Sequence, residues 1–101
     1  MKSELIRMDK TATITDAIKR KHMLHLDYHG TPRTVMPHIL GYAGTGQLSL
    51  SAYQVSGTGN GWRMFHLDEA SNVEITGKGF SRPRHDYNPD DPVFDEIVAR
   101  L

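Results

Sequence analysis

The sequence predicts a mainly β fold with flanking helices: a small antiparallel five-stranded barrel, with one helix before it and one after it. Two observations lead to this prediction. Between residues 23 and 76, apolar side chains recur at every second position in short segments, which is the period of half-buried strands. Glycine-containing turns separate these segments at the spacing of a small barrel. Segments with a helical period lie on either side of this region.

Composition narrows the class of protein. The chain has 101 residues, of which 38% are hydrophobic, and no cysteine. This length gives one domain, and the lack of cysteine excludes a disulfide scaffold, thiolate metal sites and thiol catalysis. No apolar run approaches the roughly 18 residues that span a bilayer, and the N-terminus lacks the apolar core of a signal peptide. We expect a bacterial-type cytoplasmic protein with no membrane partner.

The charged residues are unevenly distributed, although the formal net charge is zero. Residues 1–85 carry 11 Lys and Arg against 7 Asp and Glu, a balance of +4, whereas residues 86–101 carry 1 against 5, a balance of −4. A basic body with an acidic tail is compatible with nucleic-acid binding in which the tail limits non-specific contacts. An ordinary solvated surface is the alternative, because the excess is small for a dedicated nucleic-acid binder.

The first predicted element is a helix over residues 14–22. Thr13 is a suitable N-cap, and Ile14, Ala17 and Ile18 form an apolar stripe. Basic residues at 19–22 fall in the last turn, where cations complement the helix dipole. Residues 1–12 are expected to form an N-terminal arm, either a short helix or an extended segment.

The predicted strands follow this helix in short succession. They cover residues 23–28, 33–40, 47–55, 61–67 and 73–76, with turns at 29–32, 41–46, 56–61 and 68–72. Pro37 has no N–H for a ladder, so it marks an edge, a bulge or a bend. Gly57, Gly59 and Gly61 lack the lysine and helix of a phosphate-binding loop. We therefore expect them to form a flexible hairpin tip.

The strand at residues 61–67 carries a cation on its apolar face. Strand side chains alternate between faces, so Arg63, Phe65 and Leu67 point the same way. A guanidinium at the end of a strand and beside two core residues is a fixed cation at the barrel rim. Such a cation is suited to recognising an anion.

The segment at residues 77–89 is predicted to be a loop of basic and aromatic residues. Its Lys78, Arg82 and Arg84 are candidate contacts for single-stranded nucleic acid, which binds to basic and aromatic side chains. In the alternative interpretation, Phe80 and Tyr87 anchor the loop in grooves of the barrel and the arginines are solvated.

A C-terminal helix is predicted to follow this loop. Asp90 and Asp91 provide an N-cap, and Pro92 suits the first helical position. An apolar stripe follows, made of Phe94, Ile97, Val98 and Leu101. A helix of about ten residues is not stable alone, so this stripe must pack on the barrel or on a second subunit.

In order and spacing these elements resemble the WYL domain, a small Sm/SH3-like β-barrel that occurs mostly as a C-terminal sensing domain of bacterial transcription regulators. The resemblance runs from Ile14 to about Val73. It rests on Ala17-Ile18, the strand ending in Tyr28, Arg33-x-Val35-x-Pro37-His38, Leu48-x-Leu50-x-Ala52-Tyr53 and Arg63-x-Phe65-x-Leu67-Asp68. It implies one WYL-like domain over residues 1–101, with the arm at 1–12, helix and barrel at 13–76, and loop and helix at 77–101.

The chain departs from the family pattern in two places. Leu48-Ser49-Leu50 stands where the family has its naming tripeptide, so the tryptophan and tyrosine are replaced. Glu69 stands where arginine is usual. About a dozen residues precede the first predicted helix, so the resemblance implies a divergent, stand-alone member.

The resemblance also implies a ligand-binding surface. The family positions associated with ligand recognition fall on Tyr28, Arg33, His38, Tyr53 and Arg63, with Phe65 beside them. Arginine offers a planar fork to phosphate, and exposed aromatic rings stack on bases. Alternatively, the tyrosines are core residues with satisfied hydroxyls and the arginines form ordinary surface contacts.

Metal and enzyme sites are not expected. His25 and His29 share a strand face, but positions i and i+4 of a strand lie roughly 13 Å apart, too far for one zinc ion. Ser49 and Ser51 lie in a strand without the elbow of a serine hydrolase. The adjacent carboxylates Asp68 and Glu69 diverge and do not form an acid–base pair. We expect no cofactor, no metal and no catalytic residue.

Together these features predict a non-enzymatic regulatory or sensing module, linked to transcription regulation. Its ligand would be anionic, either a nucleotide or single-stranded nucleic acid. The alternative is a protein-interaction or homodimerisation module without a small ligand, in which the C-terminal helix packs on a regulatory partner or on a second copy.

Overall fold

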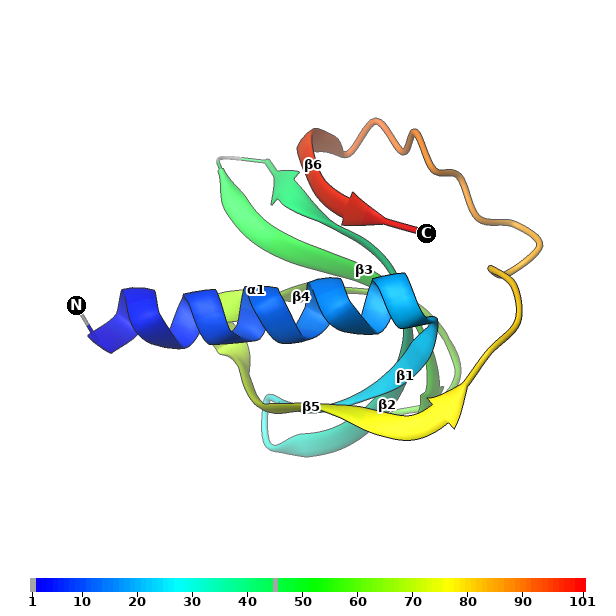
Figure 1. Ribbon diagram of the computed structural model, residues 1–101, viewed down its shortest axis with the longest axis horizontal. Helices are drawn as coiled ribbons and strands as arrows, with labels where there is room; N and C mark the ends of the chain where they lie inside the picture. The colour runs from blue at the N-terminus through cyan, green and yellow to red at the C-terminus, as the bar shows by residue number, and fades with distance from the viewer. Residues whose placement is uncertain (1, 45) are drawn as a thin grey trace.

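One long helix lies across one face of a strongly curved antiparallel sheet (Figure 1). The computed structural model describes residues 2–44 and 46–101, with side chains from residue 9 on. The helix is α1 (Lys2–Arg20), and a short 3-10 helix, η1 (Leu67–Glu69), lies between two strands. The strands are β1 (His22–Tyr28), β2 (Thr31–Ala43), β3 (Gln47–Ser56), β4 (Gly61–His66), β5 (Ala70–Gly79) and β6 (Phe94–Arg100).

The predicted mainly β, antiparallel class with an N-terminal helix is confirmed, but the sheet has six strands and does not close, so the five-stranded barrel is wrong. Its order is β4-β3-β2-β1-β5, and β6 pairs with β2. Among the described residues no ladder joins the edge strands β4 and β5. The chain passes between them through η1, whose Leu67 is buried, so a packed turn stands where a closing ladder would be.

Along one of its edges, β2 pairs with two different strands. Its first half, Thr31 to Val35, pairs with β1, and its second half, Ile39 to Ala43, pairs with β6. On the other side β3 follows it along most of its length, with a register shift between Pro37 and Ile39. The bulge expected from Pro37 is therefore present, and it falls at His38.

The C-terminal segment forms β6, so the predicted C-terminal helix is wrong. Asp91 does not cap a helix: its Oδ1 accepts a hydrogen bond from the Val93 N–H at 3.0 Å in a local turn. The second half of β2 extends beyond β1 and offers unpaired backbone groups, which β6 satisfies. Gly41 makes the close approach possible, because a Cβ atom there would lie 2.4 Å from the Glu96 carbonyl oxygen.

Helix α1 is longer than predicted. It begins at Lys2, so the start expected after Thr13 is wrong, and residues 2–12 of the predicted arm are helical rather than extended. The side chains of residues 1–8 lie outside the described part. The helix ends at Arg20, and Lys21 takes a left-handed conformation with φ 52°. In the described part of the chain no helix is long and apolar enough to cross a bilayer.

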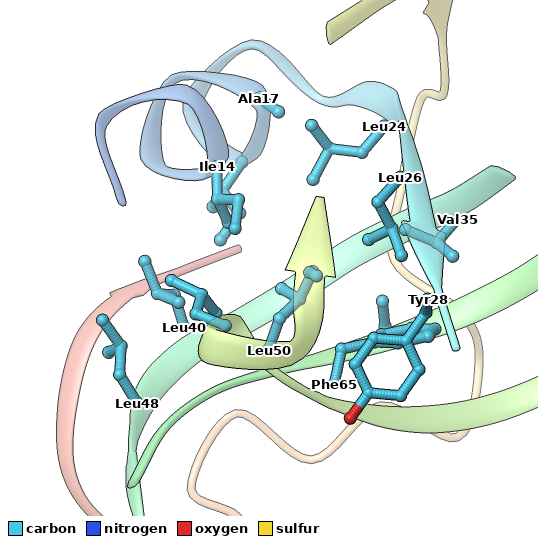
Figure 2. Close-up of a cluster of buried hydrophobic side chains, with 14 residues drawn as sticks. Ile14, Ala17, Leu24, Leu26, Tyr28, Val35, Leu40, Leu48, Leu50 and Phe65 are labelled. Carbon is cyan, nitrogen blue, oxygen red and sulfur yellow. The ribbon is translucent and has the colours of Figure 1, made fainter. Parts of the chain in front are cut away.

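Two hydrophobic clusters lie on opposite faces of the sheet. The inner cluster packs the predicted α1 stripe, Ile14, Ala17 and Ile18, against alternate residues of β1 to β4 (Figure 2). The outer cluster is smaller and contains Ile39, Ala43 and Phe94, with Met64, Tyr87 and Ile97 against it. The chain between β5 and β6 covers part of this outer face, and we call residues 80–93 the strap.

Candidate functional site

The glycine-rich turn between β3 and β4 is held by a network of polar side chains, here named the hairpin-end cluster: Arg33, Gln54, Thr58, Gly59 and Arg63. Gln54 is fully buried and lies at its centre. Its Nε2 donates to the Thr58 hydroxyl at 3.1 Å and to the Gly59 carbonyl at 2.8 Å. Its Oε1 accepts a hydrogen bond from Arg33 Nη1 at 3.3 Å.

Arg33 is half-buried against aromatic rings of the inner cluster. Its guanidinium carbon lies 5.5 Å from the Tyr28 ring centre and 5.9 Å from that of Phe65, within the range of cation–π attraction. Nη2 donates to the Tyr28 carbonyl at 3.1 Å. Nε is buried and has no hydrogen-bond partner.

Arg63 reaches the same turn from the opposite strand. Its Nη2 donates to the Thr58 carbonyl at 3.1 Å and its Nη1 to the Trp62 carbonyl at 3.0 Å. Arg63 pairs across the ladder with Ala52, on the face that carries Leu50 and Phe65. The predicted common face is therefore confirmed for Arg63 and Phe65, with Arg63 near the hairpin end of β4, whereas Leu67 lies beyond the strand in η1.

The hairpin-end cluster is positively charged and uncompensated. Among the described residues the acceptors of Arg33 and Arg63 are neutral: the Tyr28 carbonyl on β1, the Trp62 carbonyl on β4, the Thr58 carbonyl of the turn and the Gln54 amide oxygen. Within the described residues neither arginine forms an ion pair with a carboxylate. Two guanidinium groups whose acceptors are neutral keep their positive charge, which suits an anion.

Tyr28 and Phe65 lie in the core, close to this cluster. Phe65 is 1% exposed and Tyr28 8% exposed, and their rings meet edge to face at 4.9 Å. The Tyr28 hydroxyl accepts a hydrogen bond from the His66 N–H at 3.1 Å. Their geometry is that of core residues that also support Arg33.

His38 lies on the other face of the sheet, under the strap. Its Nε2 accepts a hydrogen bond from the Arg84 N–H at 3.1 Å, so Nδ1 carries the proton and donates to the Met36 carbonyl at 2.8 Å. Rings of Trp62, Tyr87 and Phe80 surround the imidazole. Desolvation by burial lowers the pKa of His38. The hydrogen bond to the Met36 carbonyl and the negative charge of Asp86 act in the opposite direction but are smaller effects.

Tyr53 also lies on the outer face. The Arg84 guanidinium sits 4.0 Å from its ring centre, and Trp62 packs against its edge. Lys78 and Arg82 are exposed, whereas Arg84 is half-buried. The sequence-predicted site residues thus form two groups: Arg33, Arg63, Tyr28 and Phe65 at the inner face and hairpin end, and His38, Tyr53 and Arg84 at the outer face.

We predict that acid destabilises the fold through His38. The unfolded chain protonates this residue near its ordinary pKa of 6.5, while the folded chain resists protonation. Stability is therefore complete above that pH and falls as the pH drops below it, by at most about 1.4 kcal/mol per pH unit for one proton. Urea unfolding at pH 7.5 and 5.5 measures the loss.

The matched variant for this measurement is His38→Gln. A glutamine amide can accept from the Arg84 N–H and donate to the Met36 carbonyl, but it does not titrate. The other five histidines are common to both proteins. The variant should lose less stability on acidification than the wild type; equal losses would show that His38 is not the responsible group.

Sequence reasoning missed Gln54, although it left a signal. Gln54 continues the inward series Leu48, Leu50 and Ala52 on β3, and a polar residue in such a series needs buried partners.

Ser49 and His66 form a cross-strand pair, in which the Ser49 Oγ lies 3.1 Å from the His66 Nδ1. Ser49 is 0% exposed, so this pair is closed to a substrate. Across the described residues no group of three metal-ligating side chains is close enough to hold an ion.

Comparison with known proteins adds a likeness of fold. The chain matches no protein-family model and no curated protein. Among solved structures it is similar to part of the proteasome accessory factor B/C (PafBC) of Arthrobacter aurescens, with a TM-score of 0.68 and 22% identity. The match covers 80% of this chain and 13% of that chain. The fold of this chain therefore recurs as a small part of a much longer protein.

Proposed function

We propose that this chain is a WYL-type regulatory module, not an enzyme, which binds an anionic ligand at the hairpin-end cluster. The observation that carries the proposal is the pair Arg33 and Arg63, both in the hairpin-end cluster and both hydrogen-bonded to neutral acceptors only among the described residues. The link to transcription regulation comes from the WYL resemblance, and the likeness to part of PafBC supports the fold on which that resemblance depends.

The chemistry of the cluster favours a phosphate-bearing ligand. Guanidinium groups donate to phosphate oxygens through a planar fork and stay charged at any physiological pH. Arg33 is held in place by Gln54 and by the Tyr28 and Phe65 rings, so little rotamer freedom remains to be lost on binding. A nucleotide and single-stranded nucleic acid both carry the required phosphate, and the test below separates them.

The other proposed ligand residues receive different roles in this arrangement. Tyr28 and Phe65 position Arg33 from the core. His38 and Tyr53, with Arg84, lie on the outer face under the strap. Contacts from Lys78 and Arg82, which are exposed, would belong to a longer nucleic acid that extends beyond the cluster.

Binding is tested by titrating the full chain at low salt with a fluorescent dT oligonucleotide, a matching RNA and a cyclic dinucleotide, followed by anisotropy. Arg33→Gln and Arg63→Gln should each weaken binding about tenfold, the value of one charge-assisted contact. For the oligonucleotides each substitution should also reduce the salt dependence, by about 0.7 in the log–log slope per lost phosphate contact.

Arg82→Gln is the matched control, because it removes an exposed arginine that lies outside the cluster. It should change affinity by less than twofold for the cyclic dinucleotide. Circular dichroism checks that each variant is folded. Wild-type affinity in both cluster variants, or an equal loss of cyclic dinucleotide affinity in the Arg82 variant, would overturn the proposal.

The alternative function, an interaction module without a small ligand, loses the helix on which it depended. What remains for it is β6, which pairs only with β2 among the described ladders and exposes Val98 at 43%. A strand with an unpaired edge can add a strand from a second chain. Light scattering that gives a dimer mass, together with no binding of any anion, would favour this alternative.

A further inference from the structure

A cavity of about 380 Å³ lies on the outer face, between β4 and the strap. Its apolar wall comes from Ile39 and Met64, and its aromatic walls from Trp62 and Tyr87. Ser51, Asn88, Asp86 and Asp91 supply the polar groups. An apolar pocket with a few convergent polar groups is the usual form of a small-molecule site.

The charge in this cavity is opposite to that of the hairpin-end cluster. Asp86 and Asp91 bring two carboxylates. The Trp62 indole N–H donates to Asp86 at 3.0 Å, and this hydrogen bond, aided by the charges of His85 and Arg84, lowers the pKa of Asp86 although desolvation opposes the shift. The carboxylate form, which an aspartate already takes at neutral pH, is thereby favoured further.

Arg63 also borders the cavity, but its charge is directed elsewhere. It lies between Trp62 and Met64 on β4, and strand alternation sends its side chain to the opposite face. There its guanidinium bonds to the Thr58 and Trp62 carbonyls at the hairpin end. The side chains that face the cavity therefore present negative charge and aromatic surface.

We propose that this cavity binds a small organic cation: an ammonium group attached to an apolar or aromatic body. The ammonium would lie between the carboxylates of Asp86 and Asp91 and the rings of Trp62 and Tyr87, since cations are attracted to both carboxylates and aromatic faces. The body would pack on Ile39 and Met64. The same face already holds one cation against an aromatic ring, because the Arg84 guanidinium lies over Tyr53 at 4.0 Å.

The site does not depend on the proposed anion site, although Trp62 and Arg63 are neighbours on β4. One strand would thus present a cation-binding cavity on its outer face and an anion-binding cluster at its inner, hairpin end. A module with two oppositely charged sites on one strand could bind two different small molecules.

The test uses Trp62, the single tryptophan of the chain, as the reporter. Full-length protein is titrated with 2-phenylethylammonium chloride and, in parallel, with sodium 3-phenylpropanoate, which has a similar shape and the opposite charge. Trp62 fluorescence excited at its red edge and the indole N–H resonance are recorded. The ammonium compound should give saturable changes in both signals at millimolar concentration, and the carboxylate should give none.

Variants separate specific binding from general affinity for cations. Asp86→Asn keeps an acceptor for the Trp62 N–H and removes the charge, so it should weaken ammonium binding five- to tenfold, as should Asp91→Asn. Glu74→Gln removes an exposed carboxylate on β5, which does not line the cavity, and should have no effect.

The proposal would be overturned if 3-phenylpropanoate bound equally well or if the signals did not saturate. An equal loss of ammonium binding in the Glu74→Gln variant would also overturn it. Arg33→Gln distinguishes the two sites: it should leave the ammonium titration unchanged while it weakens anion binding. Failure of one site in these experiments is therefore not failure of the other.

Discussion

Replacing Phe65 by alanine should destabilise the fold by about 3–5 kcal/mol, the cost of removing a buried aromatic ring. Phe65 is among the largest fully buried side chains, and it packs edge to face on Tyr28. The total free energy of unfolding of a domain of this size is roughly 5–15 kcal/mol, so the variant would be close to unfolding at 37 °C. Urea unfolding followed by circular dichroism measures the difference.

Phe65→Leu is the control for this substitution. Leucine keeps most of the apolar volume and loses the ring contacts with Tyr28 and Arg33, so we expect a cost of about 1–2 kcal/mol. A loss below 1 kcal/mol in the alanine variant would show that Phe65 is not buried in the inner cluster.

Replacing Gly41 by alanine should displace β6 and cost about 3 kcal/mol, the upper end of the range for overpacking. The added Cβ would lie 2.4 Å from the Glu96 carbonyl oxygen and 2.9 Å from Phe94 Cδ1. The closest of these atoms belongs to the backbone, which cannot rotate away, so the strand itself must shift. Urea unfolding and hydrogen exchange of the β6 amides report the two consequences.

Gly77→Ala is the matched control, because a Cβ at Gly77 meets no atom within 4 Å and its φ is not in the left-handed region. Its stability should stay within about 0.5 kcal/mol of the wild type. If Gly41→Ala is equally neutral and the β6 amides keep their protection, the pairing of β6 with β2 is wrong.

The sequence predicted those parts of the fold that local pattern determines. Alternation in β1, β3 and β4 identified the residues that face the core, and the Ile14, Ala17 and Ile18 stripe identified the buried face of α1. The prediction failed where a distant partner decides the structure. Phe94, Ile97, Val98 and Leu101 fit a helical period, but the unpaired edge of β2 turns the segment into a strand and leaves Val98 exposed.

The candidate site was likewise predictable only where local pattern determines it. Arg63 was placed correctly from alternation alone, because the face of a strand residue follows from its neighbours. The partners of Arg33 and His38 could not be predicted, since Gln54 is 21 residues from the first and Arg84 is 46 residues from the second. The aromatic residues of the strap anchor it to the sheet, as the alternative interpretation of this loop predicted, because Phe80 and Tyr87 pack against His38.

The turn that closes the β3–β4 hairpin has three glycines with positive φ, and such a sequence would be mobile in isolation. Gln54 and Arg63 tie its Thr58 and Gly59 to the strands. The conformational entropy of the turn is therefore lost when the protein folds rather than when a ligand arrives. If the proposed anion binds at this end of the molecule, it meets a pre-organised receptor, and a weak anion contact there would keep more of its free energy as affinity.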